Sequence, residues 1–341
     1  MTISRNTCRI CNTEDNHPTF VGREMMFGTR EKFEYFQCNT CNCLQITDIP
    51  KNLGNYYPSD YAPHTLPEST DQGRNWLIRL LQKQRCQTAL FRKHYKINSL
   101  LKLIVDFPSA LYEDPSGLLS IGRIITKAGL KSFDEPILDV GCGIYSDWLA
   151  HLEELGFTDL QGVDPLIPSD QQHGCMKITK SELCAVSGKF SLVTLHHSLE
   201  HILNQEATMI QIEQHLMPDG VCLIRIPIVP SIVWDEFGTN WVELDPPRHL
   251  YLHSIKSLKL LAKKAGLEVF DIQHDTTAFE FYGSEMYARD IPLIDESSPL
   301  FNKNSTLFTK EEMNSFKIRA NKVNQTEKSG RVAFFLRKAL A

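Results

Sequence analysis

Residues 136–165 read PILDVGCGIYSDWLAHLEELGFTDLQGVDP, and this stretch decides the predicted fold. An apolar run at 137–140 predicts a short buried strand, which glycines then interrupt. The leucines of the next segment recur at helical spacing until Gly156, which predicts a helix and its end. A second apolar run at 160–163 predicts another strand, and an aspartate follows it. Strand, glycine turn, helix, strand and acid is the order of a nucleoside-binding unit.

The glycine turn and the acids around it predict how a nucleoside is held. Gly141 and Gly143 let the backbone approach a ligand, and the helix that follows begins with free N–H groups. Asp164, after the second strand, can accept both ribose hydroxyls. The sequence does not match the dinucleotide-binding pattern G-x-G-x-x-G, because the third glycine is missing. Asp139, two residues before the first glycine, favours a different cofactor.

The resulting pattern, D-x-G-x-G, resembles motif I of class I S-adenosylmethionine-dependent methyltransferases. The family usually carries one more glycine two residues later, where this chain has Tyr145. An ordinary buried strand with a tight turn is the alternative interpretation. The resemblance implies a set of residues that bind S-adenosylmethionine: Asp139, Gly141, Cys142, Gly143, Asp164 and, from a later strand, His196.

Length and composition are those of an ordinary globular chain. Its 341 residues have room for one α/β domain of about 200 residues and smaller attachments. The net charge of −5 argues against a surface that binds nucleic acid as a whole. No apolar run reaches the roughly 18 residues of a membrane span, and the N-terminus lacks a signal-peptide pattern. Ten cysteines in such a chain favour metal ligation over disulfides, so we expect a cytoplasmic protein.

Two C-x-x-C pairs occur in the N-terminal module, which we place at residues 1–62. Cys8 and Cys11 form the first pair, and Cys38 and Cys41 form the second. Each pair can place two thiolates on one tight turn, and four thiolates complete a tetrahedral zinc site with no open position. We therefore predict a zinc ribbon whose structural zinc stabilises a small core. A thioredoxin-like redox pair is the alternative.

Cys43 lies close enough to compete with Cys41, but the repeated two-residue spacer favours Cys41. An aromatic stretch at 55–61 follows, and we expect it to pack rather than to cover a substrate. Residues 63–116 form a predicted linker, in which the segment 74–105 combines cations with the apolar pattern of two helices. We interpret it as an arm with a solvated basic face. Contact with substrate phosphates or acidic lipid headgroups is the alternative.

The histidines after the strand predicted at 190–195 are candidate catalytic residues. This strand continues into HHSLEH at 196–201, which is similar to a segment of the same family that ends in L-E-H. Because the carboxyl ends of parallel strands line the ligand crevice, we expect this segment to face cofactor and substrate. His201 is a candidate general base near neutral pH. The alternative is that Glu200 and His201 only cap and orient the next helix.

A tryptophan and a P-R-H-L segment then resemble a subgroup in which they lie above the active site, before the helix that leads to the sixth strand. The resemblance makes His249 a second candidate base and implies that Arg248 and Trp241 contact the substrate. The alternative is that Arg248 and His249 hold their loop together by hydrogen bonds.

The resemblance implies an α/β fold for residues 117–341, with a Rossmann-like sheet of seven strands. The sheet is mostly parallel, and its last strand, predicted at 331–337, is antiparallel. Residues 283–330 are then an insertion, which we expect to cover the substrate pocket.

We therefore predict methyl transfer from S-adenosylmethionine to a hydroxyl or carbon of a small polar acceptor. The zinc ribbon and the P-R-H-L segment together resemble bacterial sugar methyltransferases, which implies a nucleotide-linked or glycan sugar as acceptor. One alternative is an RNA or protein substrate docked by the ribbon and the basic helices, although the net charge disfavours nucleic acid. The other is a non-catalytic scaffold, which Tyr145 in the glycine turn suggests.

Overall fold

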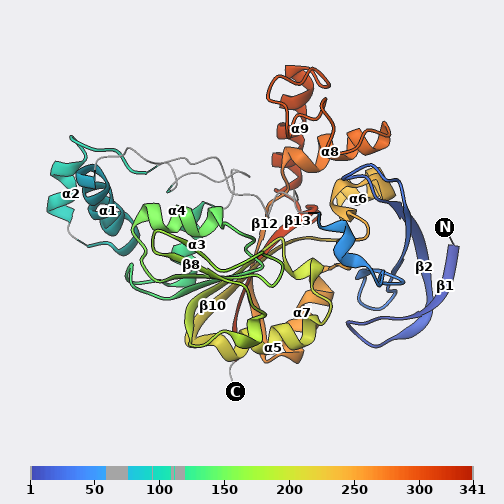
Figure 1. Ribbon diagram of the computed structural model, residues 1–341, viewed down its shortest axis with the longest axis horizontal. Helices are drawn as coiled ribbons and strands as arrows, with labels where there is room; N and C mark the ends of the chain where they lie inside the picture. Colours follow the sequence, from blue (N-terminus) through green and yellow to red (C-terminus); the bar gives the residue numbers. More distant parts are fainter. Residues whose placement is uncertain (1, 59–75, 94, 109–110, 112–119, 340–341) are drawn as a thin grey trace.

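The computed structural model describes residues 2–58, 76–93, 95–108, 111 and 120–339. A small N-terminal sheet and a larger central sheet organise them (Figure 1). The strands are β1 (Thr2–Thr7), β2 (Glu14–Arg23), β3 (Lys32–Gln37), β4 (Leu44–Ile46), β5 (Ile137–Val140), β6 (Leu160–Val163), β7 (Gln171–His173), β8 (Met176–Thr179), β9 (Phe190–His196), β10 (Leu216–Pro227), β11 (Tyr251–Leu252), β12 (Leu267–His274) and β13 (Arg331–Lys338). The helices are α1 (Trp76–Phe91), α2 (Tyr95–Leu101), α3 (Ile121–Ala128), α4 (Asp147–Leu155), α5 (Gln205–His215), α6 (Ile232–Phe237), α7 (Ile255–Lys264), α8 (Ala278–Ala288) and α9 (Lys310–Val323).

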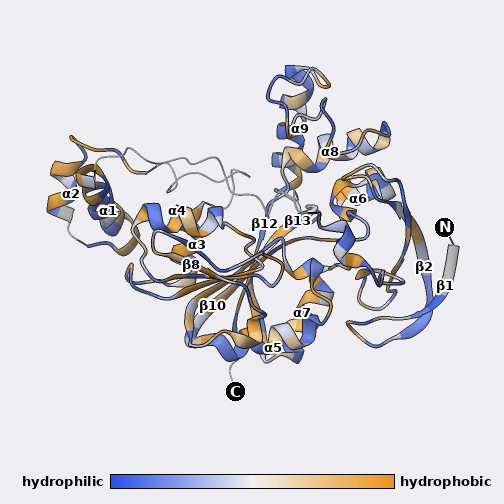
Figure 2. Cartoon of the chain, viewed as in Figure 1, coloured by the Kyte–Doolittle hydropathy of each residue, from blue (hydrophilic) through white to orange (hydrophobic). Residues whose placement is uncertain are grey.

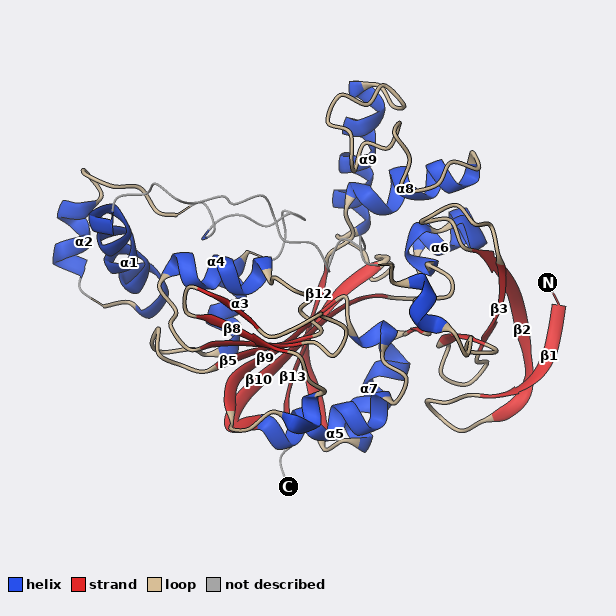
Figure 3. Cartoon of the chain, in the orientation of Figure 1, coloured by secondary structure: helices blue, strands red, loops and turns tan. Residues whose placement is uncertain are grey.

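The central sheet has the strand order β12-β13-β10-β9-β5-β6-β8-β7 (Figure 3). Neighbours from β8 to β10 are parallel, and β13 runs antiparallel between β10 and β12. The predicted mostly parallel sheet with an antiparallel last strand is confirmed. The predicted number of seven strands is corrected to eight, because β7 pairs antiparallel with β8 at the edge. The sequence of β7, QQH, has no apolar residue and therefore carries no strand signal.

Helices cover both faces of this sheet, α3 and α4 on one face and α5 and α7 on the other (Figures 1 and 2). Alternate strand residues point to opposite faces. In β9, Leu192 packs on the side of α3 and α4, whereas Val193 packs on the side of α5 and α7. Ser146 caps α4 by accepting the Leu149 N–H (3.1 Å), and the helix ends at Gly156. The predicted unit of strand, turn, helix and strand is present as β5–α4–β6.

The N-terminal sheet has the strand order β1-β2-β3-β4-β11. We call β1–β4 and their connections the ribbon. The last strand of its sheet, β11, belongs to the central domain and lies about 200 residues further along the sequence than its partner β4. Tyr35 Oη donates to the His249 carbonyl (2.8 Å), and Ser254 Oγ donates to the Cys41 carbonyl (2.5 Å). Apolar side chains of the ribbon and of the sheet face carrying α5 and α7 form one continuous core.

The helices α1 and α2 form the predicted helix pair and lie at the opposite end of the molecule from the ribbon (Figure 1). Two of their cations have structural roles. Arg85 is buried and stacks on Phe107, with 3.9 Å between Cζ and the ring centroid, and Lys83 lies over the Phe133 ring. Arg92 and neighbouring cations are exposed, but so are large apolar side chains of the same segment, Trp76 and Leu100 among them, so the exposed surface is not purely basic. Within the described residues, no helix is both long enough and apolar enough to cross a membrane.

The segment that contains α8 and α9 packs beside the ribbon (Figure 1). Asp290, just after α8, forms ion pairs with Arg23 (2.7 Å) and Arg30 (3.0 Å). Met25 of the ribbon lies in one apolar cluster with Met286 and other residues of α8. No described residue of 283–330 lines the main pocket. The expectation that this insertion covers the substrate pocket is therefore wrong, because its apolar and acidic side chains find their partners on the ribbon.

Candidate cofactor pocket and cysteine cluster

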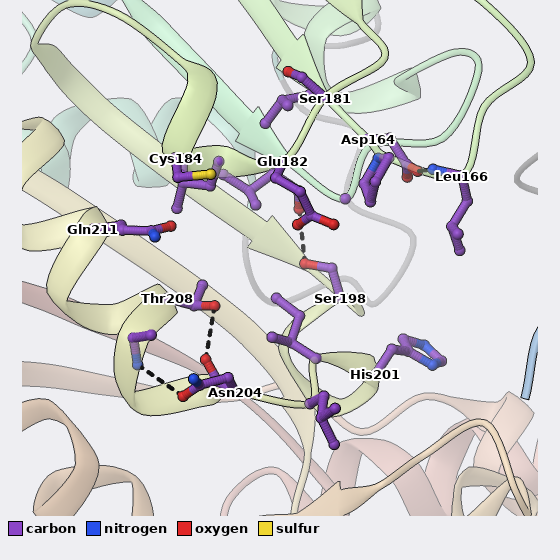
Figure 4. Close-up of a pocket in the computed structure, with 18 of the residues that line it drawn as sticks. Asp164, Leu166, Ser181, Glu182, Cys184, Ser198, His201, Asn204, Thr208 and Gln211 are labelled. Carbon is purple, nitrogen blue, oxygen red and sulfur yellow. Dashed lines mark hydrogen bonds between the residues drawn. The ribbon is translucent and has the colours of Figure 1, made fainter. Parts of the chain in front are cut away.

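A pocket of about 610 Å³ opens at the carboxyl ends of β5, β6 and β9, where parallel sheets bind their ligands. Its volume lies within the usual range for small-molecule sites, roughly 300–1,000 Å³. Figure 4 shows side chains from several segments surrounding the cavity. The central domain contributes residues within 140–141, 163–166, 181–184 and 197–211, and the N-terminal part of the chain contributes Leu53, Gly54 and Tyr57.

Gly141 and Asp164 are predicted cofactor residues that line this pocket. Gly141 has φ of +72°, and a Cβ added there would lie 2.5 Å from Ser198 Cβ, so only glycine fits. Asp164 accepts the Gly143 N–H through Oδ2 (2.9 Å) and the Leu166 N–H through Oδ1 (2.8 Å). The carboxylate thus holds the glycine turn in place, and each oxygen keeps a second lone pair for a ribose hydroxyl.

Asp139 and Cys142 lie behind the turn and not in the pocket wall. Asp139 is buried and accepts hydrogen bonds from Ser146 Oγ and Thr194 Oγ1, both at 2.7 Å. Burial raises the pKa of Asp139 to about 6. Cys142 directs its sulfur toward β6, where a Cβ on Gly162 would lie 2.6 Å from it. Both residues therefore shape the turn from behind.

Two other residues of the predicted site point away from the pocket. Tyr145 packs edge-on against His173 of β7, with ring centroids 5.2 Å apart, so its side chain does not fill the cavity. His196 packs against Trp148 (5.0 Å between centroids), and burial lowers its pKa to about 3. The next residue, His197, turns the chain with φ of +50° and lines the pocket instead.

The two candidate bases are neighbours, His201 in the pocket wall and His249 behind it, with ring centroids 4.7 Å apart. His201 Nδ1 lies 3.0 Å from the Arg248 carbonyl, and His249 Nδ1 lies 2.7 Å from the Glu243 carbonyl. Because a carbonyl only accepts, Nδ1 carries the proton in both rings and Nε2 keeps its lone pair. Burial lowers the pKa of both histidines, that of His201 to about 3, so both are neutral at pH 7.

Tyr57 is a pocket residue for which the sequence had favoured a packing role. Its Oη lies 3.0 Å from His201 Nδ1, which brings the N-terminal part of the chain into the pocket wall. The neighbouring Tyr56 packs edge-on against Phe33 and does not line the pocket. The two described tyrosines of the aromatic stretch thus divide between packing, as expected, and lining the pocket, whereas residues 59–61 lie outside the described residues. No local signal separates the two tyrosines, because Tyr57 and His201 are 144 residues apart in the sequence.

Arg248 and Trp241 are not positioned to touch a substrate. Arg248 is fully buried, with Nη2 2.9 Å from Glu24 Oε1 and Nε 2.9 Å from Asp245 Oδ2. Burial disfavours its charge, but the two carboxylates outweigh burial and raise the pKa of Arg248. Trp241 is also fully buried and packs against Trp234. The expected substrate contacts are corrected: Arg248 holds its loop to the ribbon, and Trp241 belongs to the core.

The four predicted metal ligands form one cluster, in which all Sγ atoms lie within 4.8 Å of one another. Cys8 and Cys41, like Cys11 and Cys38, have their sulfurs 3.5 Å apart, and all four are free thiols. A tetrahedral zinc ion with Zn–S bonds of about 2.3 Å would separate its sulfurs by about 3.8 Å. The cluster therefore has the size that zinc requires.

Two matched turns deliver these sulfurs. Asn12 and Asn42, directly after each pair, have φ of +60° and +61°. The N–H of Asn12 donates to the Cys8 carbonyl (2.9 Å), and that of Asn42 donates to the Cys38 carbonyl (2.8 Å). Cys43 lies outside the four-sulfur group. The two-residue spacer that both pairs share therefore indicated correctly that Cys41, and not Cys43, belongs to the cluster.

Residues 114–272 match the family model described as "Methyltransferase domain", which is just under half of the chain. This region is a methyltransferase domain, and the expectation of a methyltransferase is confirmed for it. No curated protein sequence matches the chain.

Solved structures similar to this chain include three methyltransferase-related proteins. One is a phosphoethanolamine N-methyltransferase of Haemonchus contortus in complex with S-adenosylhomocysteine, at 17% identity over 64% of this chain and 52% of that chain, with a TM-score of 0.38. Another is the cyclopropane synthase MmaA2 of Mycobacterium tuberculosis, at 13% identity over 79% of this chain and 100% of that chain, with a TM-score of 0.42. The third is a methyltransferase of Archaeoglobus fulgidus, at 17% identity over 60% of this chain and 86% of that chain, with a TM-score of 0.38. The chain spans about half the length of the first of these proteins.

Replacing Asp164 by alanine is expected to weaken S-adenosylhomocysteine binding by about 1–3 kcal/mol, because ribose hydroxyls lose their acceptor. The N–H groups of Gly143 and Leu166 lose theirs as well, which loosens the turn. Calorimetric titration of wild type and Asp164→Ala measures this change. Asp219→Ala, an exposed site far from the pocket, serves as control. Equal affinity for Asp164→Ala and wild type would remove Asp164 from the cofactor site.

Proposed function

We propose that this chain transfers a methyl group from S-adenosylmethionine to a hydroxyl or carbon of a small polar acceptor, of the nucleotide-linked or glycan sugar type. The observation that carries the proposal is the shape of the pocket. It runs from Gly141 and Asp164 to a second region that Tyr57, His201 and Asn204 line. The first region suits a nucleoside, and the second offers hydroxyl, imidazole and amide groups to a polar acceptor.

The residues of the first region fit the cofactor that the fold implies. Gly141 leaves space that a side chain would fill, Asp164 offers acceptors for the ribose, and residues 181–184 also line the pocket. When bound, S-adenosylmethionine supplies an electrophilic methyl group on a sulfonium. The protein then chiefly has to align the acceptor with that methyl group and exclude competing water.

The acceptor is placed against Tyr57 and His201 in this proposal. Both side chains line the pocket, and their contact fixes the orientation of the imidazole. His201 is neutral and offers Nε2 as a hydrogen-bond acceptor, although its low pKa makes it a weak base in the free protein. His249 has no contact with the pocket and acts from behind His201.

The cysteine cluster is proposed to hold a structural zinc ion. Four thiolates leave no open position for a substrate, and the cluster lies in the ribbon, away from the pocket lining. Gln45 Nε2 donates to Cys8 Sγ (2.9 Å), and backbone N–H groups of Ile10 and Thr40 approach Cys8 and Cys38 (3.4 Å each). Such donors stabilise the negative charge of metal-bound thiolates.

The two alternative functions receive less support. A docked RNA or protein was expected to use the ribbon and the basic helices together, but these lie at opposite ends of the molecule (Figure 1). The scaffold hypothesis depended on Tyr145, whose side chain packs on β7 and leaves the pocket open.

Incubation with methyl-labelled S-adenosylmethionine tests the proposal. The acceptors offered are a panel of nucleotide-linked sugars, total tRNA and unrelated protein, in separate reactions. We expect label in a nucleotide sugar only. Label in tRNA or protein would favour the macromolecular alternative. Cofactor binding without transfer to any of the three would favour the scaffold.

Replacing Tyr57 by phenylalanine is expected to raise KM for the acceptor about five- to tenfold, the cost of one hydrogen bond of about 1–1.4 kcal/mol. Steady-state kinetics with the acceptor identified above measures it, and titration with S-adenosylhomocysteine should show unchanged cofactor affinity. Tyr56→Phe is the matched control, because that hydroxyl bonds Glu31 outside the pocket. Equal KM values for Tyr57→Phe and wild type would place the acceptor elsewhere.

A further inference from the structure

Glu200 is a buried carboxylate that lacks the partners such a group needs. Its side chain is fully buried, and neither Oε1 nor Oε2 has a hydrogen-bond partner among the described residues. The nearest cationic candidate, His197 Nδ1, lies 3.5 Å from Oε1. A buried, unpaired carboxylate is costly, and a bound cation can supply the charge that it lacks.

Two imidazoles next to Glu200 are oriented as metal ligands are. His201 donates its Nδ1 proton to the Arg248 carbonyl, and His249 donates its Nδ1 proton to the Glu243 carbonyl. Metal-binding histidines in proteins commonly donate one ring N–H to a carbonyl or carboxylate, which fixes the ring and frees the other nitrogen. In both residues Nε2 is the nitrogen that keeps a lone pair for a metal.

The three side chains converge. One donor atom of each lies within 4.8 Å of the others, and His249 Nε2 is 4.0 Å from Glu200 Oε1. Tetrahedral ligands of one ion at bond lengths of about 2.0–2.2 Å lie about 3.3–3.6 Å apart, so His249 Nε2 and Glu200 Oε1 would have to approach each other by roughly half an ångström. Asp245 Oδ2, 3.9 Å from His249 Nε2, adds a second carboxylate to the neighbourhood.

We propose that Glu200, His201 and His249 bind one divalent transition-metal ion, separate from the cysteine cluster. Two imidazoles and a carboxylate favour zinc-like ions over magnesium or calcium, which prefer oxygen ligands only. Three protein ligands leave a coordination position open, as in catalytic metal sites. His201 lines the pocket, so an ion bound to it is next to the pocket. Resting on the proposed function, we place an oxygen of the acceptor on the open position, where it contacts the metal rather than His201 Nε2.

Metal content of the tag-free, full-length protein tests the site. The protein is saturated with zinc, freed of excess, and its zinc per chain is measured by mass spectrometry. We expect two zinc ions in wild type and one in Glu200→Gln, which keeps the shape of the side chain but removes its charge. His215→Asn, at a partly exposed histidine outside the cluster, should retain two. One zinc in wild type, or two in Glu200→Gln, would overturn the proposal.

A measurement on wild type alone avoids dependence on variant folding. Cobalt(II) is titrated into wild-type protein whose cysteine cluster already holds one equivalent of zinc, and binding is followed by absorption spectroscopy. We expect one equivalent of cobalt with only the weak visible bands of nitrogen and oxygen ligands. Absence of cobalt binding would overturn the proposal.

Thermal unfolding and activity separate this inference from the proposed function. With the cysteine cluster already filled, added zinc should raise the Tm of wild type but not that of Glu200→Gln, because an ion that binds only the folded state stabilises it. A rise in both would place the second ion elsewhere. Zinc binding at this site without methylation of any sugar would leave the metal site standing and the proposed function refuted. If Glu200→Gln binds one zinc ion and still methylates sugars at the wild-type rate, the proposed contact between metal and acceptor is refuted, whereas the metal site itself stands.

Discussion

Loss of the zinc ion that we propose for the cysteine cluster is expected to unfold the N-terminal sheet and to abolish methyl transfer. Structural zinc sites contribute on the order of 10 kcal/mol to folding, and a small ribbon has little core of its own. The effect should reach the pocket, because β11 of the central domain pairs with β4 and because Tyr57 follows the ribbon directly. Circular dichroism during thermal unfolding and the methylation assay measure it for Cys38→Ser.

A matched pair of variants shows which cysteines hold the metal. Cys41→Ala should lose the ribbon zinc, whereas Cys43→Ala should keep it and lose only the packing of one buried side chain. Zinc retained in Cys41→Ala and lost in Cys43→Ala would reverse the ligand assignment. Full activity of a zinc-free Cys38→Ser protein would contradict the structural link between ribbon and pocket.

Replacing Arg248 by methionine is expected to lower the free energy of unfolding by about 3–5 kcal/mol. The guanidinium is fully buried between Glu24 and Asp245, and its removal leaves two carboxylates without their cation. Burial alone would raise the pKa of Asp245, but Arg248 outweighs it and holds that pKa below its usual range. Urea unfolding at pH 7 measures the loss, because both acids are then charged in the unfolded chain.

The control for this variant is Arg289→Met, since the Arg289–Glu285 pair is partly exposed and should contribute less than about 1 kcal/mol. An Arg248→Met protein that keeps its stability but loses acceptor binding would restore Arg248 as a substrate anchor. A protein that loses stability with an unchanged acceptor KM in its folded fraction would agree with the structural role.

The part of the fold nearest the cofactor could be predicted because its signals are local. Apolar runs, a helical hydrophobic pattern, glycines at fixed offsets and an acid after a strand lie within the thirty residues 136–165, which form β5, α4 and β6. The cysteine cluster was predictable for the same reason: each C-x-x-C pair builds its own turn. The polar strand β7 was not, because its three residues carry no pattern.

The candidate site was predicted less completely than the fold. Asp164 and Gly141 line the pocket, but Asp139, Cys142 and His196 lie behind the turn or beside it. Sequence places a residue on an element; it does not decide whether a side chain at a strand end points into a crevice or into the layer below. Arg248 shows the same limit, because its two acidic partners determine its role and one of them, Glu24, is 224 residues away.

By itself, the sequence determined the class of fold, the glycine turn with its acid and the four clustered cysteines, because each depends on neighbours in the chain. Only the tertiary structure decided that the ribbon shares a sheet with β11, that Tyr57 meets His201 and that Glu200 lies beside two oriented histidines. The physical reason is burial. Which polar groups lose water, and which partners they then find, depends on how distant segments pack, and no local pattern carries that information.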